Sequence, residues 1–78
     1  MPGGRRTYRA RAVVLDRTKL GEQDLILTLL GSDGSQLRAV AKGARKPGGR
    51  LAARAELFSE DDFLLARGRS LDVVSEAS

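Results

Sequence analysis

Apolar and polar residues alternate along much of this chain, a pattern that predicts β-strands rather than amphipathic helices. In the first such segment, residues 8–15, arginines alternate with alanine and valine. Residues 24–30 (DLILTLL) are apolar on both faces and are closed by a glycine, and their shortness favours a buried strand over a leucine-rich helix. Between the two segments we expect a loop at residues 17–22, in which Gly21 can adopt a positive φ.

The next segment predicts a hairpin with cations on one face. Residues 31–35 (GSDGS) form its turn, because Asp-Gly is a strong turn signal, and residues 36–42 form the returning strand. Since side chains alternate along a strand, two cations four residues apart share the outer face. That spacing suits successive contacts to a phosphate backbone. The inward set is Leu37, Ala39 and Ala41, and the outward set is Arg38, Val40 and Lys42.

The second half of the chain starts with an irregular insert. Residues 43–49 contain three glycines and a proline, whereas residues 51–54 have the propensity for a short helical turn. Extended structure resumes at Phe58. The acids Glu60–Asp62 indicate a bend, a bulge or an exposed edge. Two further strands are expected at residues 63–67 and 71–75, joined by a turn at residues 68–70.

Five strands with a helical or irregular insert between the third and the fourth are typical of the OB-fold, a small, partly open barrel. We therefore predict an all-β, five-stranded OB-fold barrel over residues 8–78, preceded by a flexible leader at residues 1–7. An SH3-like barrel is the main alternative, but it has no characteristic insert at that point. A chain of 78 residues forms one domain with a modest core.

Composition narrows the functional classes. The chain has no cysteine and no histidine, which excludes disulfides, thiolate metal sites and most nucleophile–base pairs. Asp61 and Asp62 would point to opposite faces of a strand, so they are not expected to act together as acid and base. The phosphate-loop pattern G-x-x-x-x-G-K-[ST] is absent. We expect a protein that is not an enzyme and uses neither a metal nor a cofactor.

Charge points to an acidic partner. The net charge is +4 and the isoelectric point is about 10.3. Residues 1–54 carry twelve Lys/Arg against four acids, whereas residues 55–78 carry two against six; we interpret the acids at 60–62 as a solvated face. Apolar runs fall well short of the ~20 residues of a membrane-spanning helix, and no export signal is present. We expect a cytoplasmic protein without a membrane partner.

The stretch from residue 37 to residue 55 holds six basic residues and no acid. A strand that continues into a cation-rich Gly/Pro loop presents positive charge to phosphates. OB-folds bind nucleic acid on the second and third strands and the flanking loops, and each of these places carries cations here; a merely solubilising role is the alternative for any one of them. The candidate contacts are Arg17 and Lys19 near the first loop, Arg38 and Lys42 on the third strand, Arg45, Lys46 and Arg50 on the insert, and Arg67 and Arg69 beside the last turn.

Aromatic residues are scarce. Proteins that bind single strands usually stack bases on aromatic rings, and this chain has only Tyr8, Phe58 and Phe63. The two phenylalanines occupy apolar strand positions, so we expect them in the core. Binding should therefore rest on phosphate contacts, show little sequence specificity and weaken steeply with salt.

Several segments resemble the N-terminal domain of the RecO family of recombination mediators. The most specific is VAKGARK at residues 40–46, which follows a hairpin after the DLILTLL strand. The A-V-V-L-D-R start, the Gly21-Glu22 pair and Leu57-Phe58 fit the same pattern. So do G-R-S-L at residues 68–71 and S-E-A at residues 75–77, where the family often has Q-A-E.

The resemblance implies an OB-fold domain that binds single- and double-stranded DNA and helps to anneal strands, with Lys42, Arg45 and Lys46 as contacts. The implied partners are RecR and the single-strand-binding protein, and the implied role is recombinase loading in gap repair, near the bacterial nucleoid. In full-length members a helical domain follows, often with a zinc site. This chain stops at the end of the barrel, so we interpret it as the N-terminal domain alone. A module for an acidic protein partner and an RNA-binding OB domain are the alternatives.

Overall fold

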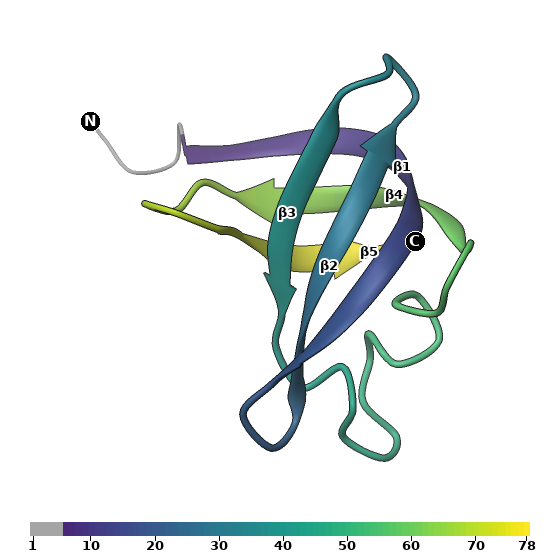
Figure 1. Cartoon of the computed structure of the whole chain (residues 1–78), viewed down its shortest axis with the longest axis vertical. Helices are drawn as coiled ribbons and strands as arrows, with labels where there is room; N and C mark the ends of the chain where they lie inside the picture. The colour runs from purple at the N-terminus through teal and green to yellow at the C-terminus, as the bar shows by residue number, and fades with distance from the viewer. Residues whose placement is uncertain (1–5) are drawn as a thin grey trace.

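Five strands form a closed barrel (Figure 1). The computed structural model describes residues 6–78 and has no α-helix within them. Around the barrel the order is β1-β2-β3-β5-β4, and β4 pairs with β1 to close it. Only β3 and β5 run parallel. The predicted all-β, five-stranded OB-fold is therefore confirmed. The strands are β1 (Thr7–Leu20), β2 (Asp24–Gly31), β3 (Gln36–Ala41), β4 (Glu60–Ala66) and β5 (Asp72–Ala77).

The first strand is longer than predicted. It begins at Thr7, and residues 1–5 of the expected leader lie outside the described residues. The loop predicted for residues 17–22 begins only at Gly21, because β1 stays paired with β2 from Ala12 to Leu20 across an irregularity between Val14 and Asp16. Gly21 has a φ of +62°, as expected for this turn.

The bend or bulge predicted at Glu60–Asp62 is wrong, because these residues begin β4 and pair in regular register with β1. The second edge of β4 is paired from Asp62 onward, so the predicted exposed edge does not extend to Asp62. Arg11 of β1 lies opposite Asp62, and on the other side the backbone of Asp62 exchanges hydrogen bonds of 2.8 and 3.0 Å with Ser78. The register of β4 against β5 shifts only after Leu64.

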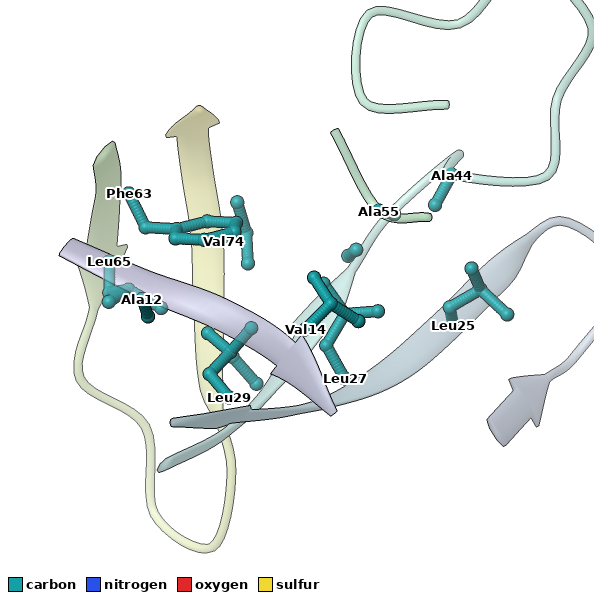
Figure 2. Close-up of a cluster of buried hydrophobic side chains, with 12 residues drawn as sticks. Ala12, Val14, Leu25, Leu27, Leu29, Ala44, Ala55, Phe63, Leu65 and Val74 are labelled. Carbon is teal, nitrogen blue, oxygen red and sulfur yellow. The ribbon is translucent and has the colours of Figure 1, made fainter. Parts of the chain in front are cut away.

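The core fills the barrel with the inward-facing side chains of the strands (Figure 2). Phe63 is the largest fully buried side chain, as expected for a core aromatic. Ala39 and Ala41 are buried and Leu37 packs against them, so the inward set predicted for the third strand is confirmed. Burial of one large apolar side chain stabilises the fold by about 1.5–3 kcal/mol.

The insert between β3 and β4 covers one end of the barrel. It consists of successive turns with a single helical hydrogen bond, from the Ala55 N–H to the Leu51 carbonyl at 3.0 Å. Ala44 and Ala55 belong to the buried cluster (Figure 2). Leu51 packs against this cluster. Because these apolar side chains anchor the insert, its polar side chains are held at the rim of the barrel.

The interpretation of the acids at 60–62 as a solvated face is wrong for Asp61, which is buried. Glu60 and Asp62, on either side of it, are exposed. Asp61 is 3% exposed. Its carboxylate accepts hydrogen bonds from Arg54 Nη1 at 3.1 Å and from Ser59 Oγ at 2.7 Å. A buried charge is tolerated when it is paired and hydrogen-bonded. Arg54 therefore fastens the insert to β4.

Phe58 is not in the core, contrary to the sequence-based expectation. Its side chain is on the surface, 73% exposed, and its φ of +65° is the sole positive value among the described non-glycine residues. A hydrogen bond of 3.1 Å from the Ser59 N–H to the Glu56 carbonyl closes a four-residue turn, and Phe58 is its third residue. A positive φ at the third position of a turn favours glycine. Both backbone groups of Val14 bond to this turn, at 2.7 and 3.0 Å, in the manner of a bulge. The chain thus bends at Phe58 and turns its ring outward.

We expect Phe58→Gly to stabilise the domain by about 1 kcal/mol, because glycine adopts left-handed φ values without steric cost. The exposed ring contributes little burial that could be lost. The melting temperature should rise by about 4–8 °C, measured by thermal unfolding in circular dichroism. Leu57→Gly in the same turn is the control and should lower the melting temperature, since Leu57 has a negative φ. A lower melting temperature for Phe58→Gly would contradict the account of this turn.

Candidate nucleic-acid interface

A groove of about 750 Å³ runs between the insert and the end of β5. The insert side carries three exposed cations, Lys42, Lys46 and Arg50. None of the three forms an ion pair within residues 6–78. The β5 side contributes Glu76 and Ser78. The groove is thus open to solvent. One of its walls is basic, and the charges on that wall are available to bind an anion.

Arg45 differs from the neighbouring cations of the insert. Its guanidinium donates to the carbonyls of Gly21 at 2.6 Å and Asp24 at 3.2 Å, and its backbone N–H donates to the carbonyl of Gln23 at 2.8 Å. The Asp24 carboxylate in turn accepts the Gly43 N–H at 2.7 Å. Arg45 therefore holds the start of the insert against the β1–β2 turn, a role that its sequence position did not reveal.

Arg38 extends the basic surface along β3. It is exposed and lies opposite Thr28 on the outer face of the sheet. Lys42 follows directly after the end of β3, at the groove. On its other edge β3 pairs with β5, where Ala39 lies beside Asp72. Because the two strands are parallel, Arg38 lies level with the residue just before β5, at the end of β3 away from the groove.

Arg17 and Lys19 lie on a different side of the barrel wall. They are opposite Leu27 and Leu25, and directly paired residues share a face of the sheet. Arg17 and Lys19 therefore lie on the same face of the β1–β2 hairpin as these core leucines. Both are nevertheless exposed to solvent. Arg38 is on the opposite face. The structure does not bring these two cations together with Arg38.

At the start of β5, a cation is stacked on an aromatic ring. The Arg67 guanidinium lies over the Tyr8 ring, with its carbon 4.4 Å from the ring centroid. The Tyr8 hydroxyl donates to Asp72 Oδ2, and Asp72 Oδ1 accepts the Gly68 N–H at 3.0 Å. Arg69 is exposed at the same turn. Sequence analysis missed this cluster, because Tyr8 and Asp72 are 64 positions apart.

The single tyrosine gives this cluster a measurable pH dependence. Burial, the hydrogen bond to Asp72 and the charge of that carboxylate raise the pKa of Tyr8 from 10.0 to about 12, against the opposing charge of Arg67. The folded state holds the phenol proton more tightly than the unfolded state. The resulting stability is complete below pH 10 and is lost as the pH rises towards 12.

A spectrophotometric titration of tyrosinate should therefore give a midpoint near 12 for the folded domain. Asp72→Asn should lower this midpoint, yet leave it above the ordinary value because burial remains. Glu22→Gln, in the turn that follows the other end of β1, is the control and should leave it unchanged. An ordinary midpoint in the folded wild-type domain would rule out the Tyr8–Asp72 hydrogen bond.

The outer face of β1 and β4 has a different electrostatic character. Arg11 forms ion pairs with Asp62 at 3.2 Å and Glu60 at 3.3 Å. Hydrogen bonds and charge from these two carboxylates raise the pKa of Arg11 above its ordinary value. The charge of Arg11 is thus neutralised by its neighbours, in contrast to the cations at the groove.

The fold and the groove define the class as a small OB-fold domain with a basic rim built by the insert between its third and fourth strands. Within residues 6–78, no group of acidic, histidine or cysteine side chains is arranged to hold a metal ion. The same residues include no helix with the length and apolar character needed to cross a membrane. The chain belongs to the RecO N-terminal family: the family model described as "Recombination protein O N terminal" matches residues 5–78.

Named relatives are similar over most of this chain. A "DNA repair protein RecO" of Bifidobacterium longum is 53% identical over 70 residues, which are 90% of this chain and 29% of the relative. The proteins of the same name from Gloeobacter violaceus and Synechococcus elongatus are 47% identical over 72 residues and 54% identical over 67 residues. These matches cover 92% and 86% of this chain, and 28% and 25% of the respective relatives. The chain therefore spans less than a third of the length of these relatives.

Proposed function

We propose that this domain binds DNA without sequence preference and without catalysing a reaction, as part of a DNA repair protein. One observation carries the proposal: the groove presents Lys42, Lys46 and Arg50, and none of these cations has a carboxylate partner within residues 6–78. Arg38 continues the charge along β3. Cations that are not neutralised by the protein can replace the counterions of a phosphate backbone, which supplies most of the affinity in non-specific binding.

Both single- and double-stranded DNA are proposed ligands, because phosphate contacts carry no sequence information and do not depend on base pairing. We assign Arg67 and Arg69 to the same contact surface and Arg17 and Lys19 to a secondary one. Arg45 contributes by positioning the insert through its bonds to the β1–β2 turn.

The names of the relatives favour DNA over the alternatives of RNA or an acidic protein, since they are called DNA repair proteins. For the whole protein we propose a part in recombinational repair, with strand annealing and recombinase loading as its activities. The proposed partners are RecR and the single-strand-binding protein, in the bacterial cytoplasm near the nucleoid.

Fluorescence anisotropy of a short labelled DNA strand at low and moderate salt tests the proposal. We expect binding at low salt that weakens steeply as salt is added, with similar affinities for unrelated sequences. The matching RNA strand and an acidic peptide serve as comparisons. Absence of DNA binding at low salt, or a clear preference for RNA or the peptide, would refute the proposal.

A further inference from the structure

The Tyr8 ring is held in one orientation. Its hydroxyl is bonded to Asp72, and this carboxylate is itself fixed by the Gly68 N–H at 3.0 Å. The ring also packs against the buried cluster. A ring with one end tied to a carboxylate and one side against the core has little freedom to rotate.

Arg67 lies over the Tyr8 ring and forms no direct ion pair within residues 6–78. The nearby Asp72 carboxylate accepts hydrogen bonds from the Tyr8 hydroxyl and from the Gly68 N–H, and the charge of Arg67 contributes to lowering its pKa. The Arg67 backbone N–H donates to the Arg6 carbonyl at 2.7 Å, which fixes the end of β4. The Arg67 guanidinium is planar, its carbon lies 4.4 Å from the ring centroid, and the residue is exposed, so the group is accessible to a ligand from solvent while it contacts the ring.

We propose that Tyr8 and Arg67 form a stacking platform for one unpaired nucleobase, on the exposed guanidinium. This proposal rests on the proposed DNA binding and adds a preference for single strands to it. Unpaired bases stack on aromatic rings and on arginine planes in proteins that bind single strands. Bases inside a duplex are already stacked on each other, so they cannot use the platform without being extruded.

The platform and the groove can contact the same strand of DNA. Asp72, which anchors the Tyr8 ring, is the first residue of β5, and residues 74–78 line the groove. At about 3.3 Å per residue, β5 spans about 17 Å between Asp72 and Ala77. Arg38 lies on the neighbouring strand β3, just before the residue that pairs with Asp72 and so level with the start of β5. A phosphate backbone held by Lys42, Lys46 and Arg50 can thus run along β3 and β5 and bring a base to Arg67.

The test compares two strands of equal length and charge: oligothymidylate, and the same backbone with abasic sites throughout. Wild-type protein should bind oligothymidylate at least about fivefold more tightly. Arg67→Lys keeps the charge but removes the plane, so it should abolish this difference by weakening only the binding of oligothymidylate. Arg69→Lys at the same turn is the matched control and should leave the difference intact. Tyr8 is the sole tyrosine and tryptophan is absent, so its fluorescence should change with oligothymidylate and not with the abasic strand.

The outcomes separate this proposal from the proposed function. Equal affinity of the wild-type protein for the two strands would overturn the platform and leave DNA binding in place. A difference that persists in Arg67→Lys, in a variant that melts like the wild type, would also overturn it. Failure to bind either strand would refute the proposed DNA binding itself, and the platform with it.

Discussion

Replacing Lys42, Lys46 and Arg50 together with alanine is expected to remove most of the affinity for single-stranded DNA at low salt. It should also reduce the slope of log affinity against log salt by about 2, because each lost phosphate contact on a single strand removes about 0.7. All three side chains are exposed and line the groove, so their removal should not disturb the core. Anisotropy titrations over a salt series measure both quantities.

A second triple variant controls for net charge. Replacement of Arg9, Arg17 and Lys19 with alanine removes an equal number of positive charges, from exposed positions outside the groove. We expect a smaller loss of affinity and a smaller change in slope than for the groove variant. Equal effects of the two variants would mean that overall charge, rather than the groove, determines binding.

Arg54→Ala is expected to destabilise the domain by about 2–3 kcal/mol, because it leaves the buried Asp61 carboxylate with only the Ser59 hydroxyl as a partner. A domain of this size is stable by about 4–12 kcal/mol, so the loss is a large fraction of the total. Urea unfolding of the variant and the wild type gives the difference in the free energy of unfolding.

Arg11→Ala is the matched control, since Arg11 forms two ion pairs but all their side chains are about half exposed. Exposed ion pairs contribute little because water screens them. We therefore expect an unfolding curve close to that of the wild type. If Arg54→Ala were equally mild, Asp61 would not depend on Arg54.

Local patterns predicted the strands well because each strand has one buried face. The alternation in β3 correctly assigned Ala39 and Ala41 to the core and Arg38 to the surface. Gly21 and the Asp-Gly turn were predictable because backbone geometry there depends on the residue itself. The insert was expected from its glycines and proline, and it has the irregular form that those residues favour.

The errors concern features that depend on distant residues. Asp61 is acidic yet buried, because Arg54 and Ser59 satisfy its carboxylate. Phe58 is apolar yet exposed, because the backbone of Val14 holds the turn that presents it. Neither partner can be inferred from hydrophobic periodicity.

In the candidate site, too, some features follow from the local sequence and others depend on distant residues. The sequence located the cations, but their availability depends on contacts that only the fold reveals. Arg45 is engaged with the β1–β2 turn, and Arg67 is stacked on Tyr8, whereas Lys42 and Lys46 are free of carboxylates within residues 6–78. Counting charges in the sequence could not distinguish these situations.

The central claim is that the groove and the adjoining surface of β3 and β5 bind DNA. Mapping of backbone amide chemical shifts during titration with a short single strand tests it most directly. We predict that the largest changes fall on residues 42–50 of the insert, on Arg38, and on residues 67–69. Changes concentrated instead around Arg11, Glu60 and Asp62, on the outer face of β1 and β4, would contradict the account.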